Sequence, residues 1–146
     1  MRKLTFPGLI AASLFIAAQA PAHQGATGIV KERMDAFKAS QQHLKSVITA
    51  AKTDEFEQVE KLARQLAEWG RAMPDYFPAD SAHPPSEAAP AIWQDFSGFS
   101  AAVDRFTRSS IQLATAGEAK DRKAVFTAIE AVAASCKSCH SDYRLK

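Results

Sequence analysis

The chain has 146 residues, a formal net charge of +2 and two cysteines, which is enough for one domain of ordinary size. With 47% hydrophobic and 23% charged residues it is neither disordered nor fibrous, and two cysteines cannot form a disulfide framework. Six glycines and seven prolines exclude a collagenous or low-complexity chain. The small basic excess leaves nucleic acid and anionic lipid as candidate partners until the charges are located along the sequence.

Residues 1–22 have the composition of a secretory signal peptide, with two basic residues, an apolar stretch and then small residues. The apolar stretch, 9–18, is too short to span a bilayer, since a span needs about 20 residues. Cleavage is expected after Ala22 rather than after Ala20, because a cut after Ala20 leaves Pro21 beside it. The mature protein is then residues 23–146.

The basic excess belongs to this leader. Removing Arg2 and Lys3 lowers the lysines and arginines from 18 to 16, while the 16 acidic residues remain, so the mature chain is formally neutral. The nucleic-acid interpretation loses its support, and no second long apolar segment follows. The sequence predicts a soluble exported protein with no membrane span, periplasmic if its source is a Gram-negative bacterium.

Four stretches of the mature chain show apolar residues at alternating spacings of three and four, the period of a helix-bundle seam. The first runs from about 29 to 51. The second ends at 73 and is expected to be capped by Thr53 or Asp54, because Asp54 followed by Glu57 resembles a capping box.

A long loop is predicted between Pro74 and Pro90, which contains five prolines and no periodic pattern. The third helix is expected from near Pro90 to Gly117, and the fourth from about Asp121 to Tyr143. No stretch alternates as a strand does. Helices joined by short, long and short connections predict an all-α, antiparallel four-helix bundle in a single domain, 23–146.

The chemistry is concentrated near the C-terminus, in Cys136-Lys137-Ser138-Cys139-His140, the Cys-x-x-Cys-His pattern of c-type haem attachment. Positions i and i+3 of a helix point to the same side, so both thiols can reach the two vinyl groups along one haem edge. His140 can then place its imidazole on one face of the ring as the iron ligand.

Three other interpretations of the cysteine pair fit less well. A thioredoxin-like redox pair belongs at the start of a helix, where the dipole lowers the thiol pKa, and this motif lies in the last turns of one. A disulfide between positions i and i+3 of a helix is strained. A zinc site needs a fourth ligand that the sequence does not place nearby.

The second face of a haem iron decides its function, and the candidate ligands are His23, His43, His83, Met34 and Met73. His23 lies at the chain start and His83 in the Pro-rich loop, where solvation is the better reading. His43 lies off the inner stripe of its helix, and Met73 is expected to pack in the core. Met34 lies on the first-helix seam and is the serious candidate, although an ordinary core methionine fits that position as well.

The motif and its surroundings resemble the class II c-type cytochromes, the cytochrome c' family. The resemblance covers the whole mature chain and is carried by a few segments: His140-Ser141-Asp142-Tyr143-Arg144 after the cysteines, Val30-Lys31-Glu32-Arg33 followed by Phe37, Phe77-Pro78 with Ser81, and Pro90-Ala91-Ile92-Trp93. It implies that Cys136 and Cys139 hold one haem c by thioether bonds and that His140 is the axial ligand.

The resemblance also assigns residues around the ring. Arg33 falls where the family keeps an arginine that pairs with a haem propionate, and Ser81 is expected to make a polar contact near the propionates. Arg144, one helical turn beyond His140, occupies the family's basic position beside the proximal face.

The distal position departs from the low-spin members of the family, which carry a methionine four residues after the arginine. Here that residue is Phe37, and a phenyl ring has no lone pair to offer iron. The expected haem is five-coordinate and high-spin, with an apolar pocket that admits NO and CO but lacks a hydrogen-bond donor for O₂. The alternative is a low-spin electron-transfer cytochrome with Met34 as the sixth ligand.

The sequence therefore predicts a haem protein, not an enzyme, that binds NO or CO and exchanges electrons with a periplasmic partner that it does not identify. A peroxidase is disfavoured because the distal segment supplies no histidine or carboxylate acid–base pair. The first two helices of the family pack against a second subunit, and apolar surplus at Leu62 and Trp69 is compatible with a homodimer.

Overall fold

A computed structural model describes residues 25–146, so the predicted signal peptide, 1–22, and His23 lie outside the described residues. Four long helices form a bundle, and a short 3₁₀ helix and a single helical turn lie in the connection between the second and third of them. The elements in chain order are α1 (Gly28–Lys52), α2 (Phe56–Ala72), η1 (Met73–Tyr76), α3 (Ala91–Gln94), α4 (Phe96–Glu118) and α5 (Arg122–Tyr143). The predicted all-α four-helix bundle is confirmed.

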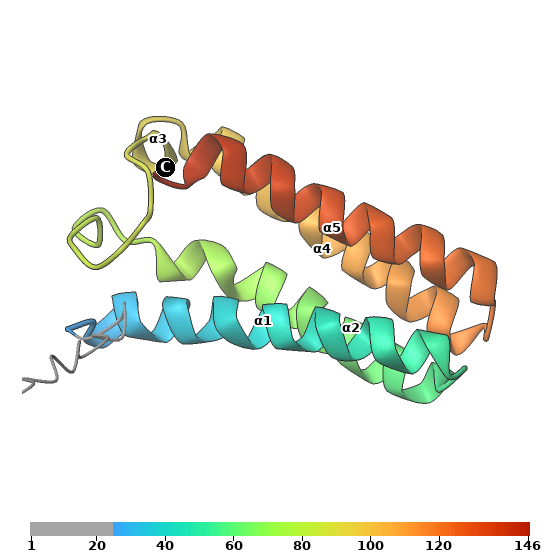
Figure 1. The fold of residues 1–146 in the computed structure, drawn as a ribbon. Coiled ribbons are helices and arrows are strands. Elements are labelled where there is room, and N and C mark those ends of the chain that lie inside the picture. Colours follow the sequence, from blue (N-terminus) through green and yellow to red (C-terminus); the bar gives the residue numbers. More distant parts are fainter. Residues whose placement is uncertain (1–24) are drawn as a thin grey trace, which may run out of the picture.

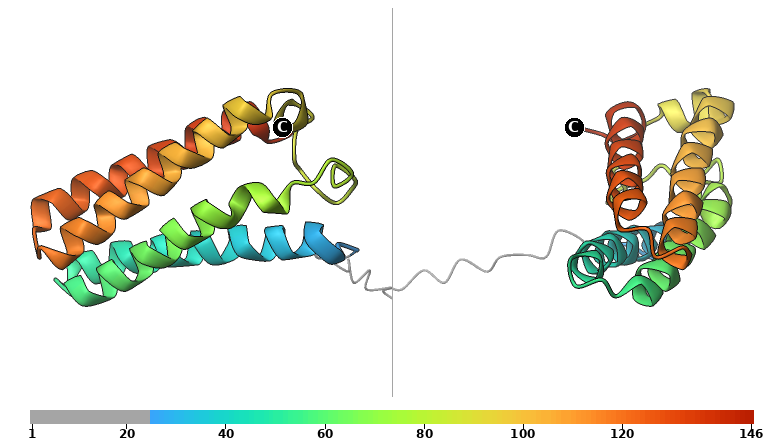
Figure 2. Two further views of the ribbon diagram at one scale, coloured as in Figure 1. Left: turned by 180° about the vertical axis from the view of Figure 1, so that it is seen from behind. Right: turned by 90° about the vertical axis from the view of Figure 1, so that its right-hand side faces the viewer.

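The four long helices are arranged as two hairpins, α1 with α2 and α4 with α5 (Figure 1). The most extensive contact joins α2 to α4, and α1 meets α5 over far less of its length. The hairpins lie close together at the turns 53–55 and 119–121 and diverge toward the end that carries α3 and the C-terminus (Figures 1 and 2). Fully buried aliphatic side chains fill the space between the helices: Val47, Val59, Leu66, Leu113, Val125 and Val132.

The predicted third helix is two helices, because Asp95 interrupts it. Asp95 has φ −135° and ψ 70°, outside the helical region, and its carboxylate accepts a hydrogen bond from the backbone N–H of Gly98 at 2.9 Å. An aspartate at this position satisfies an amide that the preceding turn leaves without a partner, which starts α4 afresh. The start of α5 agrees with the prediction, since the Asp121 side chain caps Ala124 N–H at 3.0 Å.

The predicted capping box at the start of α2 is wrong. The residue before α2 is Glu55, whose side chain makes no capping hydrogen bond, and Thr53 ends α1. Asp54 adopts a left-handed conformation, φ 58°, and forms an ion pair with Arg122 of α5. A tertiary contact thus occupies the carboxylate that the sequence pattern assigned to the helix end.

Gly117 does not end its helix but permits a close helix contact. A Cβ atom at this position would lie 2.9 Å from the backbone nitrogen of Glu60 and 3.2 Å from the carbonyl oxygen of Phe56. Both atoms belong to the α2 backbone, which cannot rotate away as a side chain can. The absence of a side chain at Gly117 therefore brings α4 against the first turn of α2.

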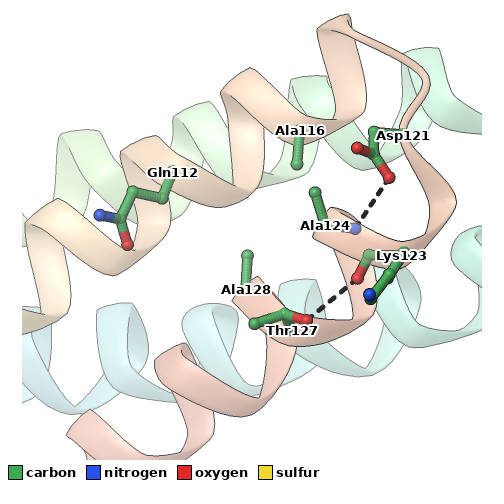
Figure 3. Close-up of a pocket in the computed structure, with 7 residues that line it drawn as sticks. All are labelled: Gln112, Ala116, Asp121, Lys123, Ala124, Thr127 and Ala128. Carbon is green, nitrogen blue, oxygen red and sulfur yellow. Dashed lines mark hydrogen bonds between the residues drawn. The ribbon is translucent and has the colours of Figure 1, made fainter.

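One hollow of about 360 Å³ lies between α4 and α5 near the turn that joins them (Figure 3). Two of its polar residues are engaged locally, Asp121 as the cap of α5 and Thr127 by donating to the Lys123 carbonyl at 3.1 Å. It lies at the opposite end of α5 from the cysteines. Within residues 25–146, no helix combines the length and apolar character needed to cross a membrane.

Candidate functional site

The predicted haem motif lies in the last two turns of α5, at the end of the bundle where α1 and α5 diverge. Cys136 and Cys139 are free and half-buried, and Cys136 packs against the core. Their spacing places both thiols on one side of the helix. His140 follows at once and is exposed. The structure therefore brings the two thiols and the imidazole together at the end of α5.

The two thiols are not activated. Burial raises the pKa of Cys139 to about 11, helped by Cys136 and only partly offset by the Arg105 cation. Burial also raises the pKa of Cys136. Catalytic and redox cysteines have lowered thiol pKa values, because the thiolate is the reactive form. A pair that stays protonated at neutral pH matches neither a redox dithiol nor a nucleophile.

His140 and Phe37 face each other across the gap between α5 and α1. Their ring centroids lie 6.4 Å apart with the ring planes at 69°. Desolvation and the nearby Arg144 cation lower the pKa of His140. The imidazole is therefore neutral at physiological pH, the form that offers a nitrogen lone pair to a metal.

An aromatic cluster supports Phe37. Trp69 of α2 packs edge-on at a centroid distance of 5.3 Å, and Phe77 lies at 6.4 Å. The Nε1 atom of Trp69 is buried and has no hydrogen-bond partner among the described residues. The sequence indicated core packing or a subunit contact for Trp69, and the role of its indole as a donor beside Phe37 was missed. Its place on the α2 seam, level with Phe37, was the available signal.

The surplus apolar surface expected on α2 is used inside the chain. Leu62 is only 7% exposed, and Trp69 packs between Phe37 and Tyr76. These two residues no longer support the homodimer, which stays a prediction.

Arg33 is 2% exposed and holds the segment after α2. Its Nη1 donates to the Tyr76 carbonyl at 3.1 Å and to Ser81 Oγ at 2.7 Å, and its Nη2 donates to the Ser81 carbonyl at 2.5 Å and to Ser86 Oγ at 2.6 Å. The guanidinium also lies over the Phe77 ring at 4.7 Å. The structure thus brings Arg33 and Ser81 together.

The Arg33 cation has no carboxylate partner in the part of the chain that the structure describes. Burial lowers its pKa, but an arginine stays charged at neutral pH. A buried charge surrounded only by neutral acceptors is costly unless an anion neutralises it. The site therefore presents a fixed positive charge near the rings of Phe37 and Phe77.

Met34 and the other candidate ligands differ from Phe37 in their burial or their contacts. Phe37 packs against the core and contacts His140, whereas Met34 is half-buried and outside the core cluster. Met73 is a core residue at 5% exposure, as predicted. His43 is half-buried along α1, and His83 is exposed in the loop.

Arg144 does not extend the helix as a further turn. It has extended backbone angles, φ −117° and ψ 136°, and its Nε donates to Glu87 Oε2 at 2.7 Å in an exposed ion pair. Glu87 was not predicted, because nothing in the local sequence pairs residues 57 positions apart.

The role of Arg33 can be tested by stability. Arg33→Met removes four hydrogen bonds and leaves the buried Ser81 acceptors without donors, so we expect a loss of about 3 kcal/mol in the free energy of unfolding. Urea unfolding followed by circular dichroism measures this loss. The matched control is Arg108→Met, which removes an exposed arginine 3.8 Å from Asp104 and should cost less than about 0.5 kcal/mol. Equal losses of unfolding free energy in the two variants would contradict a stabilising role for the Arg33 hydrogen bonds.

Comparisons with known proteins show which family the chain belongs to. The family model described as cytochrome C' matches residues 28–144. Cytochrome c' of Rhodopseudomonas palustris is 33% identical over 149 residues, which cover 100% of this chain and 97% of that protein. Cytochrome c-556 of Agrobacterium tumefaciens strain B2A is 40% identical over 77 residues, 52% of this chain and 61% of that protein.

Solved structures show the same arrangement of helices. A nitric oxide complex of a variant of cytochrome c prime from Alcaligenes xylosoxidans has a TM-score of 0.73 and 26% sequence identity, covering 81% of this chain and 94% of that chain. Cytochrome c' from Thermochromatium tepidum has a TM-score of 0.74 and 18% identity, with 81% and 95% coverage. The family match over nearly the whole described chain, together with these likenesses, shows that this protein belongs to the cytochrome c' family.

Proposed function

We propose that this protein carries one covalent haem c, bound through Cys136 and Cys139 with His140 as the axial ligand, and that NO or CO binds on the side of Phe37. The observation that carries the proposal is the placement of Phe37 opposite His140, with ring centroids 6.4 Å apart. A phenyl ring cannot ligate iron, so the distal face stays open to a small ligand.

The residues present fit a haem. Two free thiols one helical turn apart match the attachment chemistry, and a neutral imidazole follows them. Among residues 25–146, the buried Arg33 cation has no carboxylate partner and the Trp69 indole N–H has no acceptor. Haem propionates are anionic acceptors that can satisfy both groups.

The attachment would need no oxidant or other co-reactant. Each thiol would add across one vinyl double bond, with its sulfur bonding one carbon and its hydrogen going to the other. When bound, haem c supplies an iron that changes between the ferric and ferrous states and accepts a ligand on a free face. His140 would hold the haem on one side, and Phe37 would lie on the other side.

The side chains around the distal position favour neutral diatomic ligands. Phe37 and Phe77 are apolar, and the nitric oxide complex of a related protein supports NO as a ligand. The Trp69 indole modifies the fully apolar pocket expected from the sequence, since it is a donor beside Phe37. The proposed function is therefore ligand binding and electron transfer rather than enzymatic catalysis.

Export to the periplasm belongs to the same proposal. It is supported by the leader-like composition of residues 1–22 and by the bacterial cytochromes c' that the chain is similar to. The domain then consists of residues 23–146.

The visible and electron spin resonance spectra of the purified ferric protein test the proposal. We expect a high-spin ferric spectrum and a ferrous form that takes up CO, because the Phe37 ring opposite His140 has no atom that can ligate iron. A low-spin spectrum with the methionine–iron charge-transfer band would instead identify Met34 as the sixth ligand and an electron carrier as the function.

A further inference from the structure

Residues 77–89, here named the strap, cross the end of the bundle at which α1 and α5 diverge (Figures 1 and 2). The sequence predicted a loop in this region, and the structure shows that it is tied down. The Trp93 indole of α3 donates to the carbonyls of Phe77 and Pro78 at 3.1 and 3.0 Å. Ser81 is 1% exposed, which is rare for a loop residue.

The strap is fastened to α1 through Arg33. Two of the acceptors for the guanidinium belong to Ser81 and one to Ser86, all within 2.7 Å of a guanidinium nitrogen. Phe77, the first residue of the strap, lies under the same guanidinium and packs against Phe37. One end of the strap is thus in contact with the distal ring.

The strap is fastened to the end of α5 as well. Ala89 N–H donates to the Tyr143 carbonyl at 3.0 Å, and Leu145 N–H donates to the Glu87 carbonyl at 2.8 Å. Between these two hydrogen bonds, Arg144 pairs with the Glu87 carboxylate. The other end of the strap therefore holds the helix that carries His140.

The strap consequently links the two helices that face each other across the site. Direct contact between α1 and α5 is sparse, so the separation of Phe37 from His140 depends on what spans the two helices. The Arg33 end of the strap is buried, whereas the side chains of Arg144 and Glu87 are 53% and 60% exposed. The exposed end is the weaker of the two, because water and salt screen its ion pair.

We propose that Glu87 and Arg144 are positioning residues whose ion pair closes the strap, fixes the spacing of Phe37 and His140 and so limits the rate at which a neutral diatomic ligand reaches the distal face. The inference rests on the proposed function for its ligand. With the pair broken, the strap keeps two backbone hydrogen bonds to the C-terminal segment but loses its only ion pair with that segment among the described residues. The open form then becomes about two to five times more populated, the range for an exposed ion pair.

The rate of CO association with the ferrous holoprotein after flash photolysis measures this effect. Glu87→Gln should raise the rate about two- to fivefold, and Glu87→Arg should raise it at least as much, because it places two cations together. Adding Arg144→Glu to Glu87→Arg restores the pair with reversed charges and should return the rate toward that of the wild type. A Glu87→Gln rate equal to that of the wild type, or a double variant as fast as Glu87→Arg, overturns the proposal.

Two comparisons separate the strap from general effects of charge. Glu118→Gln removes an exposed interhelical pair with Arg64, 3.2 Å long, near the opposite end of the bundle, and should leave the rate unchanged. Raising the ionic strength should accelerate CO association in the wild type but not in Glu87→Gln, which has no pair left to screen. Equal acceleration of both proteins contradicts the proposal.

Hydrogen–deuterium exchange of the ferric protein tests the strap without any gas. Peptides containing Ala89 and Leu145 should exchange faster in Glu87→Gln than in the wild type, because their amides donate across the strap. A wild type that takes up no CO refutes the proposed function, and exchange then still decides whether the pair closes the strap. Unchanged exchange in Glu87→Gln refutes the strap itself.

Discussion

Replacing Cys136 and Cys139 together with serine is expected to give a protein whose haem is extracted completely by acid-acetone, whereas the haem of the wild type stays with the polypeptide. A serine hydroxyl keeps the size and polarity of the site but does not add to a vinyl group as a thiol does. The two cysteines are free and lie one turn apart on α5. Because the sequence contains only these two cysteines, no other thiol can substitute for them.

Each single variant should retain one thioether bond, and its haem should resist extraction. Ser138→Ala is the matched control, because Ser138 lies between the cysteines and is exposed. Its haem should remain covalently bound. Haem that stays attached to the double variant under acid-acetone would contradict thioether linkage.

Phe37→Met is expected to convert the ferric protein from high-spin to low-spin. Phe37 is the α1 side chain that faces His140, and methionine places a thioether sulfur with a lone pair in a similar volume at the same position. CO must then displace the sulfur, so its apparent affinity should fall by about tenfold for every 1.4 kcal/mol with which the sulfur binds iron.

Phe37→Leu is the control for loss of the ring. Leucine also offers no lone pair, and this variant should remain high-spin with CO binding intact. Electron spin resonance of the ferric forms and CO titration of the ferrous forms distinguish the variants. A Phe37→Met protein that remains high-spin would show that this side chain does not reach the iron.

The long helices followed from the sequence because their apolar periods are local. Predicted and observed bounds agree within about three residues for α1, α2 and α5. The break at Asp95 was missed because Ile92, Phe96 and Phe99 keep a helical spacing across it, so periodicity carries no sign of the interruption. Asp54 was misassigned for a different reason. Its spacing to Glu57 matches a capping box, but its carboxylate forms an ion pair with Arg122 instead.

In the candidate site, too, local arrangements could be predicted from the sequence and long-range contacts could not. The cysteines and His140 are contiguous, so their arrangement follows from a single helix. The contacts of Arg33 with Ser86 and of Glu87 with Arg144 join residues 53 and 57 positions apart, and no local pattern encodes them. The position of Trp69 on α2 hinted at its place near Phe37, but its lack of a hydrogen-bond acceptor depends on the folded chain and could not be predicted.

The close contact at Gly117 lies at the end of the bundle where the two helical hairpins are near each other, and the hairpins diverge toward the other end (Figure 1). The four long helices are stiff rods of about 25–38 Å, so a small change of angle where α4 meets α2 becomes a larger displacement at the far ends of the rods. Because α1 packs along α2 and α5 packs along α4, the angle between α2 and α4 also affects the spacing of Phe37 and His140. Gly117 therefore helps to set the geometry of a site with which it makes no contact.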